Sequence, residues 1–259
     1  MRPVALNNFM SVKIGIIGGS GLDNPDILVD AIDLKVDTIY GAHSSCLRVG
    51  KIGQAEVALL ARHDHDHTIP PSQVNYRANV SALKDWGAQY ILATTAVGSL
   101  RAQIGRGDLV ILDQFIDFTR KRTNTFFEKF ESGHPEHASL ADPFDSDLRR
   151  RLIAGCEELN LKFHPVGTVI TIEGPRFSTR AESKMFRAWG ADVINMTIAT
   201  EAALTKEAGV PYAAVAMSTD YDCWKEDEPP VTWEAVYEIF RQNADNVTKL
   251  LVATIKNIQ

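Results

Sequence analysis

Residues 72–98, SQVNYRANVSALKDWGAQYILATTAVG, contain a helix-like segment that leads directly into a strand-like one. The first segment has the apolar spacing of a helix, with a possible N-cap at Ser72 and a glycine stop at Gly87. The second is a short run of apolar and β-branched residues, which is typical of a buried strand. A helix followed by a buried strand favours a mostly parallel sheet covered by helices.

The same alternation recurs along the chain. A helix is predicted at 178–190, where Thr179 and Glu182 form a capping box, and another at 201–209, which ends at a glycine. The apolar face of residues 232–258 predicts a long amphipathic helix. Further strand-like runs are VKIGIIGG (12–19), EVALLARH (56–63), DLVILDQFI (108–116), TVITIEGP (168–175), DVINMT (192–197) and YAAVAMSTD (212–220).

Two segments depart from the alternation. Residues 46–60, CLRVGKIGQAEVALL, predict an antiparallel hairpin. Residues 119–143 show neither helix nor strand periodicity, and an irregular connection of that length indicates a functional or interface role. We therefore predict a single α/β domain over residues 1–259, with a mixed, mostly parallel sheet flanked by helices on both sides.

Composition excludes several classes of protein. A chain of 259 residues with 45% hydrophobic residues can bury a large core, and its net charge of −6 gives no electrostatic reason to expect nucleic acid or a membrane surface as partner. The cysteines, Cys46, Cys156 and Cys223, form no CxxC pair, which argues against a disulfide framework or a structural zinc site. With no signal-peptide pattern and no long apolar run, we expect a cytoplasmic protein.

Polar side chains follow several of the predicted strands, where open α/β sheets bind ligands. The glycine-rich turn GIIGGSGLDNPDI (15–27) places Ser20 where backbone N–H groups can approach an anion, although its spacing matches neither a dinucleotide fingerprint nor a P-loop. Arg62 and His63 follow a second strand, and the hydroxyls of Thr95 and Thr197 mark two more. Together these residues predict an anion-binding end of a pocket.

The segment ARHDHDHTIPP (61–71) leaves two alternatives open. His63, His65 and His67 alternate, so they would share one face of a continued strand and could ligate zinc. Arg62 would repel a metal ion beside this cluster, but it would suit phosphate through bidentate hydrogen bonds. We therefore expect no metal and keep a metal-dependent hydrolase as the alternative.

A second cluster lies at the end of the last predicted strand, in MSTDYDCW (217–224). Asp220 and Asp222 could ligate a metal, transfer protons or accept hydrogen bonds from a ligand, and a solvated turn is the simplest interpretation of such a pair. Phe177 and Ser178 precede the predicted helix 178–190 and would meet them at the same edge of the sheet. This predicts an aromatic and carboxylate end of the pocket.

Seven stretches of the chain carry a family resemblance: IGIIGGSGL, LLARHDHDHTIPPSQVNYRANVSALK, TTAVGSLR, DQFID, TIEGPRFSTRAES, WGADVINMT and AMSTDYDCW. Through them the chain resembles the trimeric purine nucleoside phosphorylase family, and within it the methylthioadenosine phosphorylases, nearly end to end. The resemblance implies phosphate-dependent cleavage of the N-glycosidic bond of 5′-methylthioadenosine, with inorganic phosphate as co-substrate, no other cofactor, and a homotrimer.

The resemblance also implies roles for individual residues. The phosphate site would consist of Ser20, Arg62, His63, Thr95, Ala96 and Thr197. The base and ribose site would consist of Phe177, Ser178, Met196, Asp220 and Asp222, with Asp220 as the catalytic acid. The 5′ pocket would be formed by Trp233, Val236, Tyr237 and, from a neighbouring subunit, His137.

Acid chemistry at the base fits this assignment. A carboxyl group can donate a proton to purine N7 and accept a hydrogen bond from a 6-amino group, whereas a 6-oxo group would turn its lone pairs toward a carboxylate. Asp220 therefore favours adenine. The alternative within the family is a 6-oxopurine phosphorylase, since relatives with that preference carry asparagine at this position. A nucleoside-binding module without catalysis is a further alternative.

The sequence departs from the family pattern at a few positions. Asp64 stands where glycine usually follows the Arg-His pair, and Thr200 stands where proline usually precedes Glu201. Trp233 and Tyr237 are bulkier than expected beside a methylthio group. The preferred 5′ substituent therefore does not follow from the sequence.

Overall fold

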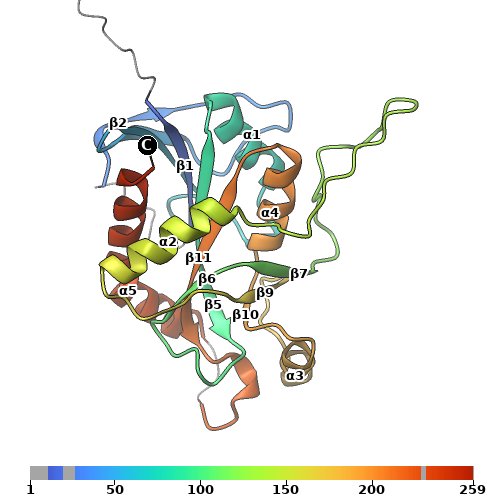
Figure 1. The fold of residues 1–259 in the computed structure, drawn as a ribbon. Coiled ribbons are helices and arrows are strands. Elements are labelled where there is room, and N and C mark those ends of the chain that lie inside the picture. Colours follow the sequence, from blue (N-terminus) through green and yellow to red (C-terminus); the bar gives the residue numbers. More distant parts are fainter. Residues whose placement is uncertain (1–10, 20–26, 229–231, 259) are drawn as a thin grey trace, which may run out of the picture.

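The computed structural model describes residues 11–19, 27–228 and 232–258. Within them a sheet of eleven strands runs through the middle of the molecule, with helices on both faces (Figure 1). The strands are β1 (Lys13–Gly18), β2 (Val29–Leu34), β3 (Leu47–Ile52), β4 (Ala55–Ala61), β5 (Tyr90–Ser99), β6 (Leu109–Ile111), β7 (Gln114–Phe118), β8 (Phe163–His164), β9 (Thr168–Ile172), β10 (Val193–Asn195) and β11 (Tyr212–Asp220).

The sheet branches at β5, and this branch creates the edge where ligands can bind. The main path is β2-β3-β4-β1-β5-β10-β9-β7, while β11 pairs with β5 and leads to β6 and β8. β5 pairs in parallel with β1 at residues 90–93 and with β11 at residues 91–98, and its end, at Gly98 and Ser99, also pairs antiparallel with β10. The sheet is mixed and mostly parallel, so the predicted fold class is confirmed.

Helices cover both faces of this sheet. Helices α2 and α5 pack against one face through residues such as Leu152 and Phe240, and α1 and α4 pack against the other through residues such as Leu83 and Ala202. The helix α3 lies at the β9–β10 end, where Phe186 is buried against Ile170. Their bounds are α1 Tyr76–Trp86, α2 Ser146–Glu158, α3 Arg180–Ala188, α4 Ile198–Glu207 and α5 Trp233–Lys256.

The start of α1 differs from the prediction. The helix is capped by Asn75, whose side chain accepts a hydrogen bond from the Ala78 N–H, while Pro71–Gln73 form a separate 3₁₀ turn. Ser72 is therefore not the N-cap, because the chain changes direction between the two turns. The predicted stop at Gly87 is confirmed: its φ is 100°, a conformation that glycine adopts without steric cost.

Other local predictions had mixed outcomes. The capping box of Thr179 and Glu182 is present, and β3 and β4 form the predicted antiparallel hairpin. The run 108–116 is not one strand, because β6 pairs with β11 whereas β7 pairs with β9. A single apolar run thus serves two different neighbours in the sheet.

The segment 119–143 projects from the body of the molecule as a long loop (Figure 1). It contains no helix or strand apart from a bridge between Glu131 and His134. Although the segment has no periodic face, the ring of Phe126 finds a partner within its own fold, 5.1 Å from that of Tyr40. Phe130 is 49% exposed. Among the described helices, none has the length and apolar character needed to cross a membrane.

Candidate active site

A pocket lies where β4, β10 and β11 end and beside the second half of β5. Thr95 was expected at a strand end but lies within β5, which continues to Ser99. From the predicted anion end, the lining contains Arg62, His63, Thr95, Ala96 and Thr197. From the predicted nucleoside end, it contains Phe177, Ser178, Met196, Asp220, Asp222, Trp233 and Val236.

Two of the predicted site residues that the structure describes are not in this lining. Tyr237 is on α5 and is 45% exposed, with its ring 5.9 Å from that of Trp233. His137 is exposed on the projecting loop, and its ring meets that of Phe130 edge-on at 5.4 Å. Ser20 lies outside the described residues.

Arg62 is held by a carboxylate that sequence reasoning did not connect to it. Its Nε and Nη2 both donate to the carboxylate of Glu201, with Nη2 2.9 Å from Oε2, and its Nη1 donates to the Thr94 carbonyl at 3.0 Å. The Tyr212 hydroxyl donates to the same carboxylate at 2.8 Å. Arg62 and Glu201 are each 1% exposed.

This pairing occupies one edge of the Arg62 guanidinium. Nε and Nη2 are donated to Glu201, 139 residues away in sequence, so a bidentate contact with phosphate stays a prediction for the remaining N–H groups. Burial opposes the charge on Arg62, but Glu201 outweighs it and raises the arginine pKa. Arg62 therefore stays cationic beside the pocket, while the carboxylate balances its charge.

His63 is buried beside this pair, and its ring has a defined protonation state. Its Nδ1 lies 2.8 Å from the carbonyl oxygen of Ile69, which can only accept a hydrogen bond. Burial, followed by the positive charge of Arg62, lowers the pKa of His63 to about 3, so its ring is neutral at neutral pH. The ring of His67 packs 4.5 Å from that of His63, and the ring of Trp233 lies 4.8 Å beyond.

The three alternating histidines do not share one face, contrary to the expectation for a continued strand. β4 ends at Ala61, and the following turn has positive φ at Asp64 and His67, 67° and 55°. His65 is exposed, whereas His63 is buried. Across the residues described, no group of three or more His, Cys, Asp or Glu side chains is arranged to hold a metal ion.

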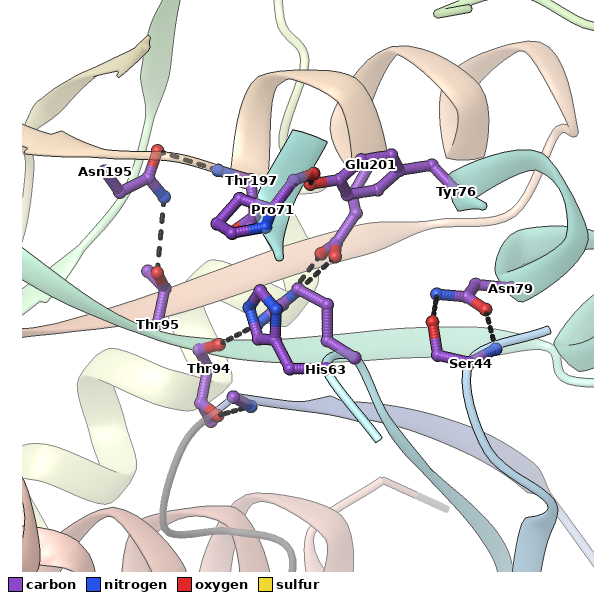
Figure 2. Close-up of polar contacts among 12 residues, drawn as sticks. Ser44, His63, Pro71, Tyr76, Asn79, Thr94, Thr95, Asn195, Thr197 and Glu201 are labelled. Atoms are coloured by element: carbon purple, nitrogen blue, oxygen red, sulfur yellow. Dashed lines mark hydrogen bonds and ion pairs between the residues drawn. The ribbon is translucent and has the colours of Figure 1, made fainter. Parts of the chain in front are cut away.

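Asn195 is a pocket residue that the sequence analysis missed. Its Oδ1 accepts from the Thr171 hydroxyl at 2.7 Å and from the Thr197 N–H at 3.4 Å, so its Nδ2 faces Thr95 Oγ1 at 3.3 Å (Figure 2). The amide thereby links Thr95 on β5 to Thr197, the N-cap of α4. Its only sequence signal was a polar residue in the strand-like run DVINMT.

Asp220 and Asp222 form the opposite end of the pocket. The Asp222 N–H donates to Asp220 Oδ1 at 2.7 Å, and the Ser178 hydroxyl donates to Asp222 Oδ1 at 2.8 Å. Burial raises the pKa of Asp220 to about 6, and burial also raises the pKa of Asp222. Gly98, also missed, permits this arrangement, since an added Cβ would lie 2.9 Å from Asp220 Oδ1.

The chain is similar to known phosphorylases over nearly its whole length. The family model of the phosphorylase superfamily matches residues 13–256. S-methyl-5′-thioadenosine phosphorylase of Xenopus tropicalis is 52% identical over 251 residues, 96% of this chain and 89% of the relative. The chain belongs to the S-methyl-5′-thioadenosine phosphorylase family. The Danio rerio member of this family is 51% identical over 249 residues, 95% of this chain and 89% of that one.

Solved structures of the family share the fold closely. Methylthioadenosine phosphorylase from Schistosoma mansoni in complex with adenine superposes with a TM-score of 0.90 at 40% identity, covering 95% of this chain and 91% of that one. A mutant of the same protein was solved in complex with methylthioadenosine, with a TM-score of 0.87, 40% identity, and coverage of 95% and 91%.

Two departures from the family pattern fit the local backbone. Asp64, where the family has glycine, has a φ of 67°, a region that aspartate tolerates better than most residues. Its carboxylate accepts from the His65 N–H and the Thr68 hydroxyl and is not in the pocket lining. Thr200 is the third residue of α4, within the first turn, where the N–H has no intrahelical acceptor and proline is therefore also accommodated.

Removing one member of the buried ion pair should destabilise the protein strongly. We expect Glu201→Leu to lower the free energy of unfolding by about 3–5 kcal/mol, because Arg62 would remain as an unpaired buried cation. The measurement is urea unfolding followed by circular dichroism. Glu226→Leu is the control: that carboxylate is 61% exposed beside Lys184, so its loss should cost less than about 1 kcal/mol. Equal losses in both variants would contradict this role of the pair.

Proposed function

We propose that the protein catalyses the phosphate-dependent cleavage of 5′-methylthioadenosine to adenine and 5-methylthioribose 1-phosphate. The observation that carries this proposal is the presence, in one pocket, of a buried carboxyl with a raised pKa opposite a set of anion-binding groups. Membership of the S-methyl-5′-thioadenosine phosphorylase family supports the choice of substrate.

The anion end positions the nucleophile. Thr95 and Thr197 supply hydroxyl groups, and the N-terminus of α4, which Thr197 caps, adds a favourable dipole. Thr197 Oγ1 is buried and has no hydrogen-bond partner among the described residues, so it is ready to bind an added ligand. Ala96 and Arg62 line the same end. Three of the five N–H groups of Arg62 are donated to Glu201 and Thr94, so two remain for the anion.

The nucleoside end stabilises the leaving group. A phosphate oxygen attacks C1′ of the ribose, the C1′–N9 bond breaks, and its electron pair moves into the purine. Asp220, whose pKa of about 6 lies closer to neutrality than that of an ordinary aspartate, donates a proton to N7. Asp222 accepts a hydrogen bond from the 6-amino group, while Phe177 and Met196 pack against the base and the ribose.

The direct test is adenine release from 5′-methylthioadenosine, measured with and without phosphate and with and without EDTA. We expect release to require phosphate and to survive chelation. Release in phosphate-free buffer that stops with EDTA would support a metal-dependent hydrolase instead. Nucleoside binding without any release would indicate a binding module.

Asp220 should determine both the base preference and one limb of the pH profile. We expect Asp220→Asn to lower kcat/KM for methylthioadenosine by at least about 100-fold and to raise the ratio of inosine to adenosine cleavage, because the amide can donate to a 6-oxo group. In the wild type, kcat/KM should fall as pH rises through about 6, where Asp220 loses its proton.

The pH limb should be absent in Asp220→Asn. Asp227→Asn, at an exposed position on the same connection, is the control and should keep both the base preference and the limb. An unchanged inosine-to-adenosine ratio in Asp220→Asn would show that another residue reads the base.

We further propose a homotrimer in which His137 completes the 5′ pocket of a neighbouring subunit, beside Trp233 and Val236 of that subunit. Three observations support this arrangement: the loop 119–143 projects from the molecule, the ring of Phe130 is exposed, and His137 is not in the lining of its own pocket. The free state of Cys46, Cys156 and Cys223 supports a cytoplasmic location.

Light scattering should give about three times the chain mass of 28.6 kDa under assay conditions. We expect His137→Ala to raise KM for methylthioadenosine about tenfold, with KM for phosphate unchanged, since a 5′ contact does not touch the anion. His134→Ala, on the same exposed loop, is the control. A fully active monomer would contradict the shared site.

A further inference from the structure

The anion end of the pocket contains little uncompensated positive charge. The carboxylate of Glu201 lies against the guanidinium of Arg62, and both are buried, so the pair has a net charge of zero. The neighbouring ring of His63 is neutral, because burial and the charge of Arg62 lower its pKa to about 3. An anion in this site is therefore bound mainly by hydrogen bonds.

Most of the hydrogen-bond donors at this end of the pocket can bind any oxyanion. Asn195 donates to Thr95 Oγ1, and the Thr95 hydroxyl in turn donates to the Ala96 carbonyl at 3.1 Å, a hydrogen bond that it would exchange for one to a ligand. The Thr197 hydroxyl is buried and lacks a partner within the described residues. Donors of this kind bind sulfate and phosphate alike, because both anions present lone pairs.

His63 differs from these donors. Since the carbonyl of Ile69 can only accept, Nδ1 must carry the proton of the neutral ring, and Nε2 must carry a lone pair. Within the part of the chain that the structure describes, Nε2 has no hydrogen-bond partner, and the ring lines the pocket. The carboxylate of Glu201 is also an acceptor, but it already accepts from Arg62 and Tyr212 and is not in the lining.

We propose that His63 accepts a hydrogen bond from the P–OH group of the bound anion and so makes the site selective for a protonated oxyanion, hydrogenphosphate, over sulfate. Inorganic phosphate keeps at least one proton at neutral pH, whereas sulfate has none. With sulfate, the lone pair of Nε2 would face an oxygen lone pair, which is unfavourable in a site with little water. This inference rests on the proposed function, since it refines how the phosphate site selects its ligand.

The experiment measures binding of phosphate and of sulfate to the full-length protein by isothermal titration calorimetry at neutral pH. We expect the wild type to bind phosphate at least tenfold more tightly than sulfate, and arsenate, which is also protonated, to behave like phosphate. His63→Leu removes the acceptor, so it should weaken phosphate binding at least tenfold and leave sulfate binding within about threefold.

Thr197→Val is the matched control, because it removes a donor of similar size. It should weaken phosphate and sulfate binding by similar factors, so the ratio of the two affinities should stay near the wild-type value. Equal affinities in the wild type, or equal weakening of both anions in His63→Leu, would overturn the proposal.

Nitrogen-15 NMR of the wild-type protein tests the same point without a variant, in case His63→Leu does not fold. The ring of His63 should give the shifts of a neutral imidazole protonated at Nδ1, and an imidazolium or an Nε2-protonated ring would overturn the proposal. Because binding is measured directly, a protein that binds phosphate but releases no adenine would contradict the proposed function alone.

Discussion

The guanidinium of Arg62 is buried, and a buried cation is stable in a protein only when a carboxylate and further hydrogen bonds compensate it. Glu201 on α4 supplies the carboxylate, Tyr212 on β11 supplies a further hydrogen bond to it, and Thr94 on β5 accepts from the arginine. This one interaction ties the end of β4 to a helix and to two central strands. The anion end of the pocket is built over that junction.

Burial determines the chemistry at both ends of the pocket, with opposite results. At the anion end it keeps His63 neutral, because a second positive charge beside Arg62 would be costly in a desolvated site. At the base end it raises the pKa of Asp220, so that a carboxyl group can act as an acid close to neutral pH. Burial thus produces an anion site with no net charge at one end of the pocket and a proton donor at the other.

Local features of the fold could be predicted because their causes are local. The capping box at Thr179 and the glycine stop at Gly87 depend on neighbouring residues, and both are present. The cap of α1 was misplaced because Ser72 and Asn75 are both acceptable caps, and the preceding prolines decide where the chain turns. The run 108–116 was misread because strand pairing depends on partners far away in sequence.

Short segments of the sequence were enough to predict the fold class, most of its helices and strands and twelve residues of the pocket lining, because periodicity and family motifs are local. Three features follow only from the folded structure: Arg62 pairs with Glu201, Asn195 connects Thr95 to Thr197, and His63 packs on His67 while His65 is exposed. Hydrogen-bond partners, tautomers and pKa values depend on burial and on contacts between distant segments. These are fixed only when the strands are placed side by side.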